Sequence, residues 1–71
     1  MRHPAPPEFQ SQAPLLDERE AAEFLTLPLR TIRERRYLGQ PPAFVRMGRA
    51  VRYRRCDLLH YLESCVKTPE L

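Results

Sequence analysis

Apolar residues recur at helical spacing near the start of the chain, directly after an acidic segment. Ala21, Phe24 and Leu25 fall at i, i+3 and i+4 spacing, which predicts one face of a short helix. Asp17 and Glu20 have the spacing of a capping box, and acidic side chains stabilise a helix N-terminus. The pattern therefore predicts a helix that begins after Asp17 and runs to Leu25.

A second helix is predicted over 28–38, after a tight turn at 26–27. Proline is favoured at the first helical position, here Pro28, and glycine just beyond the last, here Gly39. Ile32 is the clearest apolar anchor of this helix, and four of its positions are arginine. Two helices joined by a short turn, the second of them cationic, are typical of a helix-turn-helix.

The pattern then changes to alternation and later returns to helical spacing. Residues 43–47 and 51–54 are predicted to be two strands, since apolar residues alternate with arginines over 45–47 and 51–54, and the glycine-containing segment 48–50 joins them into a hairpin. Alternation would turn the apolar side chains toward the helices and the arginines outward. A last helix is predicted from about 55 to 66, with an apolar stripe formed by Leu58, Tyr61, Leu62 and Cys65.

These elements predict a mainly α fold with a small β-hairpin, a winged helix-turn-helix in which the last helix closes the core. We assign this domain to residues 15–66. Residues 1–14 hold four prolines and almost no apolar periodicity, so we expect a disordered tail, either inert or a minor-groove arm. Residues 67–71 are expected to be a short C-terminal tail.

Charge is distributed unevenly along the chain, whose formal net charge is +3. Residues 30–55 hold nine arginines against one acid, Glu34, whereas residues 17–23 hold four acids against Arg19. The basic block suits a polyanion, and the planar guanidinium suits phosphates and guanine edges. A merely solvated basic face is the alternative interpretation.

The chain offers no pattern that predicts catalysis, a cofactor or a metal site. It has no Ser/His/Asp set and no Gly-rich phosphate loop, and Cys56, His60 and Cys65 lack a metal-binding spacing. We expect both cysteines to be reduced thiols, Cys56 on the surface and Cys65 in the core. No apolar run approaches the roughly 18 residues that span a membrane, and no signal peptide is visible.

The chain resembles the small winged helix-turn-helix proteins of the excisionase type, which are related to the DNA-binding domain of mercury-resistance regulators. The resemblance covers about residues 15–64 and rests on the runs LDEREAAEFL (16–25), RTI (30–32), GQPPAFVRMGR (39–49) and VRYRRCDL (51–58). Three features depart from the family pattern. Pro28 replaces a Ser or Thr cap, Arg35 replaces a packed Trp or Leu, and Tyr37 and Leu38 replace polar residues.

The resemblance implies that the second helix enters the major groove, with DNA contacts at Leu29, Arg30, Arg33 and Glu34. We expect Arg33, before any other residue, to contact a base. Arg30 would hold a phosphate or form a bidentate pair with guanine. Glu34 would accept from cytosine N4 or form an ion pair with Arg30. Among the predicted contacts, Thr31 is expected to be a packed or helix-start residue. Arg36 is expected either to contact the DNA backbone or to cover the core with the apolar part of its side chain.

The resemblance also implies that the hairpin reaches the adjacent minor groove or the backbone, with contacts at Arg46, Arg49, Arg52 and Arg54. Arg49 stands at the predicted tip, and a basic tip suits a narrow, A·T-rich minor groove. A charged surface turn is the alternative.

The expected function is sequence-selective binding of double-stranded DNA. By resemblance, an excisionase of a bacterial mobile element loads beside an attachment site, bends the DNA and directs a separate integrase toward excision. This predicts cooperative self-association along DNA, with the acids of 17–23 on one copy meeting arginines of the next, and a cytoplasmic, nucleoid-associated location. A transcriptional regulator of the same fold and a module whose basic face binds an acidic protein are alternatives. RNA binding is a weaker alternative, because Tyr37 is the only candidate for the aromatic platform on which RNA bases stack.

Overall fold

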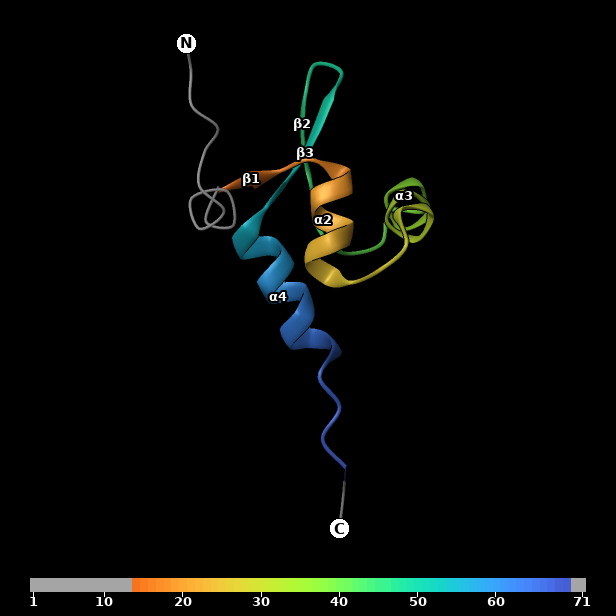
Figure 1. Cartoon of the computed structure of the whole chain (residues 1–71), viewed down its shortest axis with the longest axis vertical. Coiled ribbons are helices and arrows are strands. Elements are labelled where there is room, and N and C mark those ends of the chain that lie inside the picture. The colour runs from red at the N-terminus through yellow and green to blue at the C-terminus, as the bar shows by residue number, and fades with distance from the viewer. Residues whose placement is uncertain (1–13, 70–71) are drawn as a thin grey trace.

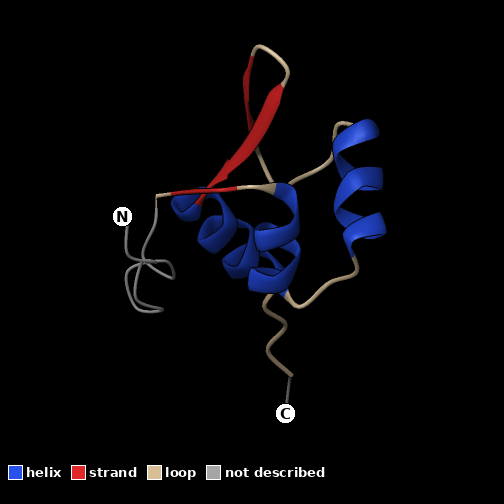
Figure 2. Ribbon diagram, turned by 45° about the horizontal axis from the view of Figure 1, so that its top comes forward, coloured by secondary structure: helices blue, strands red, loops and turns tan. Residues whose placement is uncertain are grey.

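Residues 14–69, which are described by a computed structural model, form three helices and a three-stranded antiparallel sheet (Figure 1). The elements in chain order are β1 (Leu15–Leu16), α2 (Glu18–Leu25), α3 (Leu29–Tyr37), β2 (Val45–Met47), β3 (Ala50–Arg54) and α4 (Arg55–Cys65). The β2–β3 hairpin projects beyond the helices, and α3 stands to one side of α2 and α4 (Figure 2). This layout is compatible with a winged helix.

The predicted capping box starts α2. Asp17 Oδ1 accepts from the Glu20 N–H at 2.8 Å, and Glu20 Oε1 accepts from the Asp17 N–H at 2.9 Å. Two backbone donors at the helix start are thereby satisfied. The helix buries Ala21, Ala22 and Leu25, so the face predicted from its spacing is the one that packs.

The turn after α2 contains a left-handed residue that is not glycine. Thr26 has φ 58° and ψ 41°, and it is the only non-glycine residue with positive φ in the described part of the chain. Its N–H donates to the Glu23 carbonyl at 3.1 Å, and the Leu27 N–H donates to the Ala22 carbonyl at 2.9 Å. These two bonds are those of a Schellman motif, which ends α2 and starts the path to α3.

Helix α3 begins one residue later than predicted, at Leu29. Pro28 is its N-cap rather than its first helical residue, because the ψ of Pro28 is 145° and therefore extended. Ile32 is fully buried, as expected of the anchor of this helix. Gly39, with φ 73°, ends it as predicted and completes a second Schellman motif.

The sheet has one strand more than the predicted two-stranded wing. Strand β3 lies between β1 and β2, with Leu15 opposite Arg54 and Leu16 opposite Tyr53. A two-residue strand has too few positions to show alternation, so no sequence pattern revealed β1. The Pro14 carbonyl accepts from the Arg55 N–H at 3.0 Å, which extends the folded unit one residue beyond the predicted start. The remainder of the predicted N-terminal tail and residues 70–71 lie outside the described residues.

The β2–β3 hairpin is closed by a two-residue turn. Met47 pairs with Ala50, which leaves Gly48 and Arg49 as the turn. Gly48 has φ 61°, a conformation that a two-residue hairpin turn needs and that glycine adopts easily. Only the base of the hairpin covers the helices, because Val45 is half-buried while Met47 is 48% exposed.

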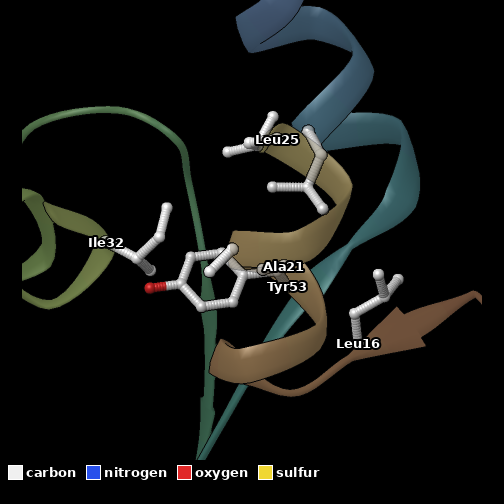
Figure 3. Close-up of a cluster of buried hydrophobic side chains, with 7 residues drawn as sticks. Leu16, Ala21, Leu25, Ile32 and Tyr53 are labelled. Carbon is white, nitrogen blue, oxygen red and sulfur yellow. The ribbon is translucent and has the colours of Figure 1, made fainter. Parts of the chain in front are cut away.

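The core lies where β1, α2, α3, β3 and the start of α4 meet, and Figure 3 shows five of its members labelled. It consists of Leu16, Ala21, Ala22, Leu25, Ile32, Tyr53 and Leu58. The predicted stripe of α4 is only half right. Leu58 is fully buried, but Leu62 is 38% exposed and Cys65 is exposed, because α4 runs past the core (Figure 1).

Arg35 performs a packing role, which explains how α3 tolerates it where the resemblance implies a Trp or Leu. Its Nε donates to the Pro41 carbonyl, and its guanidinium carbon lies 5.2 Å from the centroid of the Tyr61 ring. Arg35 thus joins α3 to the following loop and to α4. Tyr37 and Leu38 do not replace the missing apolar residue, since they are 88% and 57% exposed.

Candidate nucleic-acid interface

The outer face of α3 carries a polar set at helical spacing. Arg30, Arg33, Glu34 and Tyr37 line one shallow hollow on the surface. These positions are i, i+3, i+4 and i+7, so they share one face of the helix, while Ile32 points into the core. Tyr37 was not among the predicted contacts, although the same spacing would have found it.

No side chain caps the start of α3. Because an uncapped helix start presents backbone N–H groups and the positive end of the helix dipole, it favours an anion. Arg30 stands within this first turn and is exposed. Arg30 and Glu34 form no ion pair with each other in the described part of the chain, so both are open to a ligand.

Glu18, in the first turn of α2, holds two arginines of α3. Arg33 donates to its Oε2 through Nε at 3.0 Å and through Nη2 at 2.6 Å. Arg36 donates to its Oε1 through Nη2 at 3.2 Å. The Arg33 guanidinium holds the pKa of Glu18 below its usual value, although partial burial of the carboxylate opposes this effect. Glu18 is therefore charged and paired at neutral pH.

Arg36 continues this network into the core. Its Nη1 donates to the Tyr53 hydroxyl at 3.0 Å, and only 20% of its side chain is exposed. Figure 3 shows the Tyr53 hydroxyl pointing toward α3. Of the two roles considered for Arg36, the structure favours the one in which the side chain covers the core.

The remaining predicted contacts of α3 lie partly inside the molecule. Leu29 packs against the core, and Thr31 is half-buried. Leu29 contributes to the fold but is only partly buried, so its expected contact with DNA stays a prediction. Thr31 is placed as the sequence suggested, as a packed residue of the helix start.

The four arginines predicted on the hairpin differ in their surroundings. Arg49 lies at the tip, is exposed and has no hydrogen-bond or ion-pair partner among residues 14–69. The guanidinium of Arg46 lies 5.7 Å from the centroid of the Phe44 ring, and Arg52 donates to the Val51 carbonyl at 2.8 Å. Arg54 is at the base, paired with Asp57 of α4 at 2.7 Å. Arg54 therefore stabilises the junction of β3 and α4.

A basic hollow of about 380 Å³ lies between the hairpin, the start of α2 and α3. Its lining includes four arginines and two acids: Arg19, Arg36, Arg49, Arg52, Asp17 and Glu18. Arg19 was not predicted as a contact, because it stands in an acidic segment of the sequence. The hollow thus brings two arginines of the hairpin together with Arg19 of α2 and Arg36 of α3.

Another hollow lies between the loop 39–44 and α4. It is lined by those loop residues and by Asp57, His60, Tyr61 and Ser64, and no arginine lines it.

Within the described residues, no three His, Cys, Asp or Glu side chains are grouped so that they would hold a metal ion. None of the described helices has the length and apolar character needed to cross a membrane.

No protein-family model matches the chain, and no curated protein is significantly similar to it. The interpretation of the basic surface therefore depends on its own geometry and chemistry.

Proposed function

We propose that the chain is a winged helix-turn-helix protein that binds double-stranded DNA in a sequence-selective manner and catalyses no reaction. The observation that carries this proposal is that arginines line two hollows, one on the outer face of α3 and one between the β2–β3 hairpin, the start of α2 and α3. In this proposal α3 enters the major groove, which accommodates a helix, and the hairpin tip enters the adjacent minor groove.

The residues have separate roles in the proposed complex. Arg33 and Arg30 read guanine or hold a phosphate in the major groove, and Glu34 accepts from cytosine. Arg49 enters the minor groove. Arg19 and Arg52 hold the phosphates of the strand that crosses between the two grooves, since they line the hollow between α3 and the hairpin.

Salt-dependent binding to duplexes tests this proposal. Fluorescence anisotropy with labelled duplexes, repeated over a range of salt concentrations, should give log K falling linearly with log salt, with a slope of about −0.9 per neutralised phosphate. A pool of duplexes with a randomised segment should yield an enriched sequence after selection. Absence of duplex binding even at low salt would refute the proposal and favour the module that binds an acidic protein.

Within this function we propose the role of an excisionase of a bacterial mobile element. Its support is the resemblance of residues 15–64, and its partners are the attachment-site DNA, further copies of the chain and an integrase. Self-association through the acids of α2 involves fewer groups than the sequence suggested. Glu18 is already paired with α3, and Asp17 and Glu20 cap α2, so three of the four acids of 17–23 are engaged among the described residues.

Binding to attachment-site duplexes of the host element, with promoter duplexes of equal length as controls, separates this role from that of a transcriptional regulator. An excisionase should load cooperatively at the attachment region and support excision by the integrase. Selective binding at a promoter instead would assign the regulator role to the same interface.

A further inference from the structure

A chain of hydrogen bonds connects Glu18 to the buried Tyr53. Tyr53 of β3 is 1% exposed, and its hydroxyl accepts from Arg36, which in turn donates to Glu18 Oε1. The other carboxylate oxygen, Oε2, holds Arg33. A single network therefore runs from the buried side of the sheet to the outer face of α3.

The contact between Glu18 and Arg33 leaves one edge of the guanidinium available. Arginine has five N–H donors in a fixed planar fork. Glu18 takes the side edge, which consists of Nε and one hydrogen of Nη2. The end edge, which consists of Nη1 and the other hydrogen of Nη2, has no partner among the described residues, and the Arg33 side chain is 55% exposed. Two parallel donors on one edge are what guanine O6 and N7 accept.

We infer that Glu18 is a positioning residue that holds Arg33 in one orientation before DNA arrives, with the free edge of its guanidinium directed outward to read a base. This inference rests on the proposed function. Ordering a long side chain on binding costs conformational entropy, and a side chain that the fold already orders avoids part of that cost. Glu18 thus contributes to base selectivity although it is an acid facing a polyanion.

The opposite consequence of the same contact is that Glu18 competes with DNA for Arg33. Positioning and competition predict different effects of removing Glu18. A competitor lowers the affinity for every duplex, and its removal improves binding. A positioning residue sharpens the preference for one base, and its removal weakens that preference, even if the loss of a negative charge strengthens binding to all duplexes.

Glu18→Gln tests the inference, with Glu23→Gln as the matched control. Both residues are glutamates of α2, both substitutions remove one negative charge, and Glu23 is exposed without an ion pair in the described part of the chain. The probe is a pool of duplexes with a randomised segment, selected separately by the wild type, by each variant, by Arg33→Ala and by the Glu18→Gln/Arg33→Ala double variant. Sequencing gives the base preference at each position. Unfolding midpoints show that every variant is folded at the selection temperature.

Arg33→Ala identifies the base position that depends on Arg33. At that position Glu18→Gln should reduce the preference for the favoured base by about 2- to 10-fold, the range expected when one long side chain loses its pre-ordering. Glu23→Gln should leave this preference unchanged, and the double variant should match Arg33→Ala alone. Position-independent changes in affinity should be similar for the two glutamine variants.

An equal or sharper base preference in Glu18→Gln than in Glu23→Gln would overturn the inference. So would a further loss in the double variant, because Glu18 would then act independently of Arg33. If the wild type enriches no sequence and binds no duplex, the proposed function itself fails, and the inference fails with it. If the wild type selects a sequence that Arg33→Ala selects equally well, DNA binding stands but Arg33 is not a reader.

Discussion

Replacing Thr26 by glycine should stabilise the protein, although glycine usually destabilises a fold. Thr26 has φ 58° and ψ 41°, which is left-handed backbone that a β-branched residue rarely adopts. For an L-residue this conformation costs roughly 1–2 kcal/mol, and glycine adopts it without that cost. The Thr26 side chain is exposed and forms no hydrogen bond with any described residue, so its removal loses little.

The opposing effect of the substitution acts on the unfolded chain. Glycine gives the unfolded state more freedom, which costs about 0.4–1 kcal/mol. The difference favours Thr26→Gly by about 0.5–1 kcal/mol. In a domain of this length the midpoint of thermal unfolding should rise by roughly 2–8 °C. Both backbone hydrogen bonds of the turn are kept, because the N–H groups of residues 26 and 27 are unchanged.

Urea unfolding followed by circular dichroism measures this effect, with Glu23→Gly as the control. Glu23 is an exposed residue near the end of the same helix, and there glycine should cost about 0.5–1 kcal/mol. The two glycine variants should therefore shift the midpoint in opposite directions with the same dependence on urea. A loss of stability in Thr26→Gly similar to that in Glu23→Gly would refute the reasoning, since it would show that the left-handed conformation is not strained.

Three further predictions concern the basic surface. Tyr53→Phe removes the hydroxyl that accepts from Arg36, so the free energy of unfolding measured by urea titration should fall by about 1–2 kcal/mol. An unchanged free energy would mean that Glu18 alone satisfies the Arg36 guanidinium. Because Arg33 lowers the pKa of Glu18, the stability from this pair is present above the usual glutamate pKa of about 4.3 and is lost as the pH falls through the lower folded-state pKa. Thermal midpoints measured from pH 5 to pH 3 should therefore decline less in Glu18→Gln than in the wild type, and equal declines would contradict this linkage. Arg49→Ala should weaken binding to all duplexes evenly and reduce the salt slope of log K by about 1, whereas an unchanged slope would show that Arg49 neutralises no phosphate.

Local patterns predicted most of the helices and the hairpin correctly. The capping box at Asp17 and the glycine after α3 are signals over a few residues, and both appear in the structure. Strand β1 was missed because Leu15–Leu16 is too short to show a period, and only its pairing with β3 defines it. Cys65 was wrongly assigned to the core, because a helical period gives the face of a helix but not the length over which another element covers it.

The sequence predicted several residues of the candidate site, but it missed Arg19 and Tyr37 and the contacts that connect the site. Spacing and charge identified Arg30, Arg33 and Arg49 as exposed cations. Glu18 was predicted as an acid of a helix start and as a contact to a second copy, not as a partner of Arg33 in the same molecule. Its bonds to Arg33 and to an arginine 18 positions away depend on how α3 packs against α2, which no local pattern contains. The share of Leu29 that packs against the core also depends on this tertiary packing.

The order of strands in the sheet also bears on how the protein behaves at high concentration. A free strand edge can pair with a strand of another molecule, and proteins limit this hazard with short edge strands and charged residues. Here the longest strand, β3, is enclosed, while the edges are the two residues of β1 and the three of β2, with Arg46 at the middle of β2. Such edges limit the joining of one copy to another, including where the proposed loading on DNA would bring copies close together. Arg46 also keeps the β2 edge charged, which opposes pairing of this sheet with the sheet of another molecule.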